Sequence, residues 1–151
     1  MLTEYVRPYT PLLAEYQDYL IHIDTVSAKA KYAVEINGVL PLITSQRRLS
    51  LVNAYHPLLY TANKKRKEKT HPQSIALTQE GRIIVISGPN AGGKSITLKT
   101  VGLLQVMLQS GFLVPLQADS EMCLFDRILT DIGDNQSICL LYNYYPAYDL
   151  Y

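Results

Sequence analysis

The sequence lacks several features that would place it in a specialised class of protein. Its two cysteines, Cys123 and Cys139, form no CxxC pair, so both are expected to be reduced thiols outside any disulfide framework. A net charge of +1 gives no overall field that attracts nucleic acid. No apolar run approaches the roughly 18 residues that cross a membrane. The first ten residues carry Glu4 and Arg7 and lack the apolar core of a signal peptide, so we expect a cytoplasmic protein with no membrane partner.

The composition is that of a globular protein, with 48% hydrophobic and 18% charged residues. Its 151 residues suffice for one ordinary domain, or for a small domain with an appendage. Apolar residues at steps of three and four predict helix over residues 12–36, either as one helix or as two with a break near Asp24. Asn37-Gly38, with Pro41 just beyond, indicates the end of that helix and a subdomain boundary.

The remaining pattern predicts short strands and a second helix. A helix is expected from Lys94 to Ser110, with Gly111 just past its end. The continuous apolar run Ile83–Ser87 is typical of a strand covered on both faces. Asp131, Asp134 and Gln136 are expected on a loop, and the tyrosine-rich residues 139–151 show no clear period. The other expected strands are residues 49–55, 74–77, 122–125 and 128–132.

The segment Gly88–Ser95 reads GPNAGGKS and matches the phosphate-binding pattern GxxxxGK followed by Ser or Thr. Glycine reaches positive φ without a steric clash, so such a loop can turn successive backbone N–H groups toward an anion. Lys94 is then expected to reach the β- and γ-phosphates of ATP, and the Ser95 hydroxyl to bind Mg²⁺. The candidate nucleotide-binding residues are Gly88, Pro89, Asn90, Ala91, Gly92, Gly93, Lys94, Ser95 and Ile96.

Two other features allow a functional and a structural interpretation. His56 directly precedes Pro57, and at such a position a histidine is more often a structural turn residue than a catalytic base or a metal ligand. No second histidine or carboxylate stands at metal-ligand spacing, so no zinc site is predicted. The basic run Lys64–Lys69 is interpreted as a solvated loop in preference to a patch for phosphate backbones. We therefore assign no catalytic residue.

Several separated motifs carry a family resemblance. GPNAGGKSITLKTVGLLQVMLQSGFLVP at Gly88–Pro115 resembles the P-loop and following helix of the MutS family, the ATPases of DNA mismatch repair and recombination control. LKTVGLL and QSG within it resemble the bacterial recombination-suppressing branch, as does DIGDNQSI at Asp131–Ile138. HPLL at His56–Leu59 and DTVSAKA at Asp24–Ala30 resemble the same branch. The resemblance covers roughly residues 12–138.

The resemblance implies an α/β fold, with an incomplete P-loop NTPase sheet of the ABC-like MutS type preceded by a helical connector. Residues 1–48 are then a connector of the core or lever type, and residues 49–151 the N-terminal part of an ATPase domain with an atypical tail at 139–151. The implied cofactors are ATP and Mg²⁺, with Asp131 and Gln136 in a loop facing the nucleotide. Family members act as homodimers that clamp DNA through other domains, and ATP or ADP occupies each site.

The sequence departs from the family pattern near its end. No apolar run ending in Asp-Glu, the Walker B motif, follows Ser95, and residues 143–145 carry no Ser or Thr of the trans-acting signature. We therefore expect an internal fragment truncated before Walker B, with a tail that reads as a frameshift. Such a chain is expected to bind ATP weakly and to hydrolyse it negligibly. A non-catalytic nucleotide-binding or dimerisation module is the alternative, and an unrelated small P-loop kinase is the third hypothesis.

Overall fold

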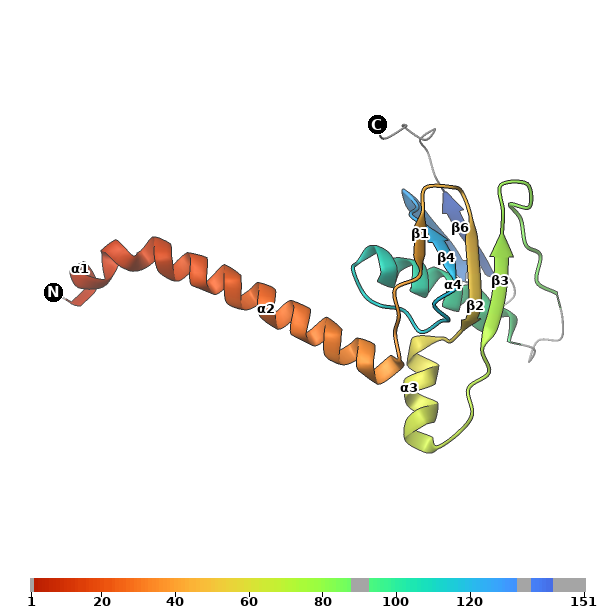
Figure 1. The fold of residues 1–151 in the computed structure, drawn as a ribbon, viewed down its shortest axis with the longest axis horizontal. Helices are drawn as coiled ribbons and strands as arrows, with labels where there is room; N and C mark the ends of the chain where they lie inside the picture. Colours follow the sequence, from red (N-terminus) through yellow and green to blue (C-terminus); the bar gives the residue numbers. More distant parts are fainter. Residues whose placement is uncertain (1, 88–92, 133–136, 143–151) are drawn as a thin grey trace.

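The computed structural model describes residues 2–87, 93–132 and 137–142. A long helix projects from a mixed α/β body in which the strands and two further helices gather (Figure 1). In chain order the elements are α1 (Leu2–Val6), η1 (Arg7–Tyr9), α2 (Thr10–Ile36), β1 (Leu42–Thr44), β2 (Leu49–Ala54), α3 (Pro57–Arg66), β3 (Gln73–Leu77), α4 (Lys94–Gln109), β4 (Glu121–Cys123), β5 (Arg127–Ile132) and β6 (Ser137–Tyr142).

The first predicted helix is a single element, α2, with no break near Asp24. It ends where the sequence predicts, because Asn37 adopts a left-handed conformation with φ 52°. Asparagine tolerates this conformation better than most residues. The Gly38 N–H then donates to the Ala33 carbonyl over 2.7 Å, which satisfies one of the last carbonyls of the helix.

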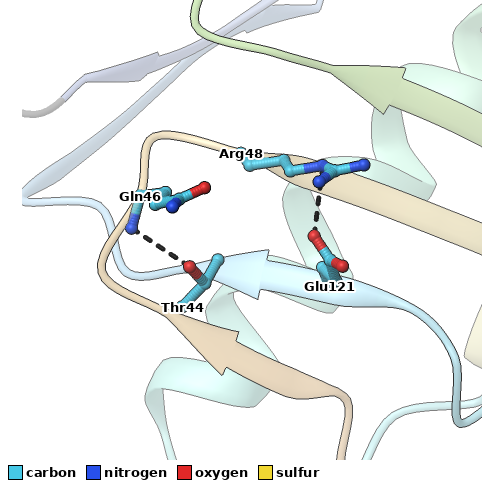
Figure 2. A network of polar contacts seen from close by, with 4 residues as sticks. All are labelled: Thr44, Gln46, Arg48 and Glu121. Carbon is cyan, nitrogen blue, oxygen red and sulfur yellow. Dashed lines mark hydrogen bonds and ion pairs between the residues drawn. The ribbon is translucent and has the colours of Figure 1, made fainter.

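A four-stranded sheet in the order β1-β4-β2-β3 forms the body. β1 and β4 are parallel, whereas β2 is antiparallel to both of its neighbours, β4 and β3. Figure 2 shows the turn between β1 and β2, where Arg48 forms an ion pair with Glu121 of β4 over 3.1 Å. The Gln46 N–H donates to the Thr44 hydroxyl in the same turn. The ion pair is half exposed on the arginine side, so its contribution to stability is small.

The hydrophobic core lies between α4, the sheet and the last turn of α2. Val101, Leu104 and Leu108 recur at helical spacing along α4 and are buried, which is the pattern of a helix with one face on a core. They pack in one cluster whose other buried members are Ile36, Leu49, Leu51, Ala54, Met107, Val114, Leu116 and Met122. The helix that follows the glycine-rich loop is therefore held firmly by the body.

One helix was missed by the sequence interpretation. The interpretation of Lys64–Lys69 as a loop is wrong for its first three residues, which form the last turn of α3. Proline at the first position of a helix, after a residue that caps it, is a start signal that His56-Pro57 carries. The predicted exposure of the basic run is confirmed, since residues 64–69 are all exposed.

The predicted buried strand at residues 83–87 is wrong. Residues 82–87 form no strand, and the side chains of Ile83 and Val85 are each 85% exposed. An apolar, β-branched run becomes a strand only when a neighbouring strand pairs with its backbone groups. None of the described strands pairs with this segment, so its local preference is not realised.

Two further expectations are corrected at β5 and β6. The strand predicted over residues 128–132 is confirmed as β5, and it contains Asp131, which pairs with Ile138 of β6; the separate expectation of Asp131 on a loop is wrong. The first residues of the tyrosine-rich tail, 139–142, belong to β6, where no regular element was predicted. The two strands form an antiparallel hairpin from Arg127↔Tyr142 to Ile132↔Ser137, a pairing that local periodicity does not reveal. Residues 143–151 lie outside the described part of the chain.

Candidate nucleotide-binding site

The described half of the predicted phosphate loop forms the N-terminus of α4. Gly93 is the residue that precedes the helix, with φ 78°, and Lys94 is the first helical residue, as the motif predicts. A Cβ at Gly93 would come only within 3.4 Å of the Ile96 Cγ2, so the backbone angle, and not lack of space, favours glycine here. The Thr97 N–H and hydroxyl both donate to the Gly93 carbonyl over 3.0 Å and fix the first turn.

The structure brings together only part of the predicted site. Gly93, Lys94, Ser95 and Ile96 share the first turn of α4, with Lys94 half-buried and Ser95 exposed. The remaining loop residues and Gln136 lie outside the described residues: Gly88, Pro89, Asn90, Ala91, Gly92 and Gln136. For Asp131 the structure describes the backbone within β5, and its orientation toward a nucleotide stays a prediction.

This helix start suits a phosphate anion and a hard cation. The first backbone N–H groups of an α-helix have no partner within the helix, and the helix dipole adds positive potential at that end. A lysine and a hydroxyl in the same turn supply a cation for phosphate oxygens and an oxygen ligand for Mg²⁺. The residues present therefore fit the phosphates of a nucleotide with its magnesium ion.

Two glutamines of α4, missed by sequence interpretation, hold the helix against the strands. Gln105 is fully buried and donates to the Cys123 carbonyl over 2.9 Å. Gln109, one turn later, accepts from the Phe125 N–H and donates to the Phe125 carbonyl. The available signal was a polar residue between Leu104 and Leu108 on the apolar face of the helix. These contacts set the position of α4 relative to β4.

The opposite end of α4 is tied to α2. The Lys29 ammonium donates to the Ser110 carbonyl over 2.6 Å, where the negative end of the α4 dipole favours a cation. It also lies 5.0 Å from the centre of the Phe112 ring, which meets Tyr32 edge-to-face at 6.2 Å. Burial, reinforced by the charge of Glu35, raises the pKa of Tyr32. α4 therefore connects the candidate site to the long projecting helix.

His56 is a structural residue at the start of α3, as the sequence favoured. Its Nδ1 accepts from the Leu59 N–H over 3.4 Å, which makes it the cap of that helix. Burial is the main reason that the pKa of His56 is lowered, and the positive charge of Lys99 lowers it further, against an opposing backbone hydrogen bond. The neutral imidazole is the form that caps the helix.

The lowered pKa of His56 predicts that acid weakens the fold. The unfolded chain, with a histidine pKa of about 6.5, binds this proton more readily than the folded chain. The contribution of neutral His56 is therefore present above pH about 6.5 and lost as the pH falls through the lowered value. We expect the urea midpoint to fall between pH 7.5 and pH 5. His56→Asn keeps a capping oxygen that does not titrate, so equal pH dependence in both proteins would contradict this account.

Other candidate chemistry is weaker in the described residues. Lys64 of the basic run donates to the Glu35 carbonyl over 2.9 Å and lies 5.7 Å from the Tyr60 ring centre, so it ties α3 to α2. Cys123 is a buried free thiol, and burial is the main cause of its raised pKa, which disfavours the reactive thiolate. Within the described ranges no three His, Cys, Asp or Glu side chains gather as a metal site. No described helix is long and apolar enough to cross a membrane.

Comparison with known proteins supports the class of protein that the helix start and its motif suggest. Residues 84–142 match the family described as MutS domain V, and this segment includes the whole of α4, β4, β5 and β6. The segment is therefore similar to the P-loop ATPase domain of the MutS family.

The curated relatives specify the branch. The chain is 48% identical over 122 residues to the Endonuclease MutS2 of Finegoldia magna, covering 81% of the chain and 15% of the relative. It is 42% identical over 137 residues to the Endonuclease MutS2 of Pediococcus pentosaceus, covering 91% of the chain and 17% of the relative. The chain thus spans about one sixth of the length of these relatives. These matches support the interpretation of the chain as a segment of a MutS-family ATPase, similar to the MutS2 branch.

Proposed function

We propose that residues Gly88–Ile96 bind ATP through its phosphates, with Ser95 as a ligand of Mg²⁺. The observation that carries this proposal is the start of α4, where a left-handed Gly93 delivers Lys94 and Ser95 into the first turn of a well-anchored helix. The match of residues 84–142 to MutS domain V supports the same role. When bound, Mg²⁺ would neutralise phosphate charge, while the loop amides and Lys94 orient the phosphates.

In the protein to which this segment is related, we propose that ATP binding and hydrolysis shift DNA-bound states of a homodimer. The path from Lys94 along α4 to the Lys29 contact at Ser110 supports such coupling, because it joins the nucleotide end of α4 to α2. Residues 1–48 would serve as the connector and residues 49–151 as part of the ATPase domain. The same proposal has three further parts. The related protein binds DNA, Asp131 and Gln136 lie near the nucleotide, and the protein is cytoplasmic.

For the 151-residue chain by itself we propose nucleotide binding without appreciable turnover. Phosphoryl transfer needs carboxylates that hold Mg²⁺ and orient water, and no Asp-Glu pair after an apolar run follows Ser95. Loss of such a group typically lowers the rate by a factor of about 100 to 1,000.

Binding and turnover of the purified chain test this proposal together. We expect a fluorescent ATP analogue to bind saturably at one site in the presence of Mg²⁺, while phosphate release stays at the rate of a blank without protein. Turnover near ~1 per second, an ordinary enzymatic rate, would contradict binding without catalysis. Absence of saturable binding would contradict the proposed site itself.

A further inference from the structure

A cavity of about 330 Å³ lies where α2 joins the body, and we call it the junction cavity. Its described lining comes from the C-terminal end of α2, the end of β2, α3, the residue before β3 and the segment after α4. Figure 1 shows α2 and α3 approaching β2 and β3 at one end of the sheet. The volume falls within the range of small-molecule sites.

The inner lining of the junction cavity is apolar and aromatic. Ile36, Pro115 and Leu116 line it and are buried. Tyr55 and Tyr60 line it as well and are half-buried, with ring centres 5.2 Å apart and planes inclined at 57°. Such rings offer flat apolar faces for a planar ligand.

Three primary amides complete the polar part of the lining: Asn37, Asn53 and Gln117. Each amide group presents an acceptor oxygen beside a donor NH₂. The Asn37 Nδ2 donates to the Tyr60 hydroxyl over 2.6 Å, which leaves the Asn37 Oδ1 as an acceptor. Asn37 and Gln117 are exposed, so the amides lie where the cavity meets solvent.

An irregularity in β2 places Asn53 in the lining. Leu49 and Leu51 form the buried face of the strand, and regular alternation would put Asn53 on that face too. The pairing with β3 shifts between Leu51 and Ala54, and Asn53 takes φ 47°. The buried face then continues at Ala54, while Asn53 is half-buried beside the cavity. Bulges of this kind redirect side chains next to functional sites.

Backbone hydrogen bonds hold the cavity together before any ligand binds. The Tyr55 N–H donates to the Pro115 carbonyl over 2.8 Å, and the Gln117 N–H donates to the Val52 carbonyl over 2.9 Å. These bonds join the end of β2 to the segment after α4, so the aromatic and amide parts of the lining are held in register. A pre-formed site avoids the cost of ordering its walls on binding.

We propose that the junction cavity binds a neutral nucleobase. None of the described residues that line it is charged, so the lining selects neither an anion nor a cation. A tyrosine face stacks on a planar base. The adjacent donor and acceptor of an asparagine or glutamine amide match those of a base edge, such as N6 and N7 of adenine. A planar heterocycle with a polar edge therefore suits both parts of the lining.

This site is separate from the proposed ATP site. Its described lining includes no residue of α4, whose first turn carries Lys94 and Ser95. The proposed ATP site recognises phosphate through a cation and helix amides, whereas the junction cavity recognises a base without phosphate. Failure of the loop to bind ATP would leave this inference standing, and the converse also holds.

Calorimetric titration of the full chain with adenosine, which has no phosphate, tests the inference. We expect one site with a dissociation constant below about 1 mM, in keeping with a ligand of this size. Gln117→Ala should raise this constant at least about 10-fold, because a pair of hydrogen bonds to the base is lost. Asn53→Gly should act in the same direction, since glycine keeps the left-handed backbone.

Gln46→Ala is the matched control. It removes an exposed amide from the turn between β1 and β2, outside the cavity, and should leave the adenosine affinity unchanged. Circular dichroism should show the parent fold in all three variants. No adenosine binding up to about 5 mM would overturn the proposal, as would equal weakening by Gln117→Ala and Gln46→Ala.

Two crossed measurements separate the junction cavity from the loop. Lys94→Ala should leave the adenosine affinity unchanged, and Gln117→Ala should leave the affinity for a fluorescent ATP analogue unchanged. If Gln117→Ala weakened both ligands by the same factor, the cavity would be the base end of the ATP site. That result would contradict a separate site.

A short single-stranded oligonucleotide of deoxyadenosine identifies the carrier of the base. The Lys64 Nζ lies 5.7 Å from the centre of the Tyr60 ring, so a phosphate attached to a bound base would meet a cation. Binding more than about 10-fold tighter than adenosine, and equally sensitive to Gln117→Ala, would assign the site to an unpaired base of a strand. Affinity similar to that of adenosine would assign it to a free nucleoside.

Discussion

Replacing Lys94 by alanine is expected to weaken ATP binding about 10- to 100-fold, since a charge-assisted contact with phosphate is removed. Lys94 is the first residue of α4 and is half-buried. The rest of the loop retains its backbone N–H groups, so some binding should remain. Titration with a fluorescent ATP analogue in excess Mg²⁺ measures the change directly.

Lys99→Ala is the matched control for this experiment. Lys99 lies on the same helix, just over one turn further along, and is exposed. The control removes one positive charge from the same helix, five residues after Lys94, and leaves the predicted loop intact. We expect its ATP affinity to stay within about twofold of the parent chain, an effect of long-range charge alone. Equal affinity of Lys94→Ala and the parent chain would mean that the loop is not the site.

Truncating Leu104 to alanine is expected to destabilise the fold by about 2–5 kcal/mol, the usual cost of a large buried aliphatic side chain. The Leu104 side chain is fully buried and belongs to the cluster that joins α4 to the sheet. The change removes apolar contacts and leaves a cavity that rigid neighbours fill only in part. Urea unfolding followed by circular dichroism gives the free energy of unfolding.

Val106→Ala provides the comparison on the outer face of the same helix. Val106 is 47% exposed, and alanine has the higher helix propensity, so the expected change is within about 0.5 kcal/mol. A similar loss of stability in both variants would show that α4 is not packed against the sheet through Leu104. The pair therefore tests the burial of α4 without touching the nucleotide loop.

The parts of the fold that follow from local chemistry were predictable from the sequence. Asn37-Gly38 ends α2 because a left-handed residue stops a helix, and Gly93 precedes α4 for a related conformational reason. The buried face of α4 follows from its apolar spacing. The candidate site is built on that helix, so its described half, from Gly93 to Ile96, could be placed from the motif alone.

The parts that depend on distant partners were not predictable in this way. Residues 83–87 have strong β-preference but no pairing strand among the described residues, whereas β6 forms because β5 pairs with it. α3 was missed because the basic residues of its last turn were interpreted as a solvated loop, although His56-Pro57 carries a helix start signal. Gln105 is a polar residue on an apolar helix face, and its burial is explained only by the hydrogen bond that it donates to the distant Cys123 carbonyl.

Photolabelling with an ATP analogue that carries an azide on its γ-phosphate tests the proposed location of the nucleotide most directly. The chain is irradiated with Mg²⁺, digested and mapped by mass spectrometry, with excess unlabelled ATP as the competitor. Our account predicts a competed label within residues 83–99, which contain the loop and the first turns of α4. A competed label confined to the exposed basic run, residues 64–69, would contradict it, since phosphate would then be held by surface charge.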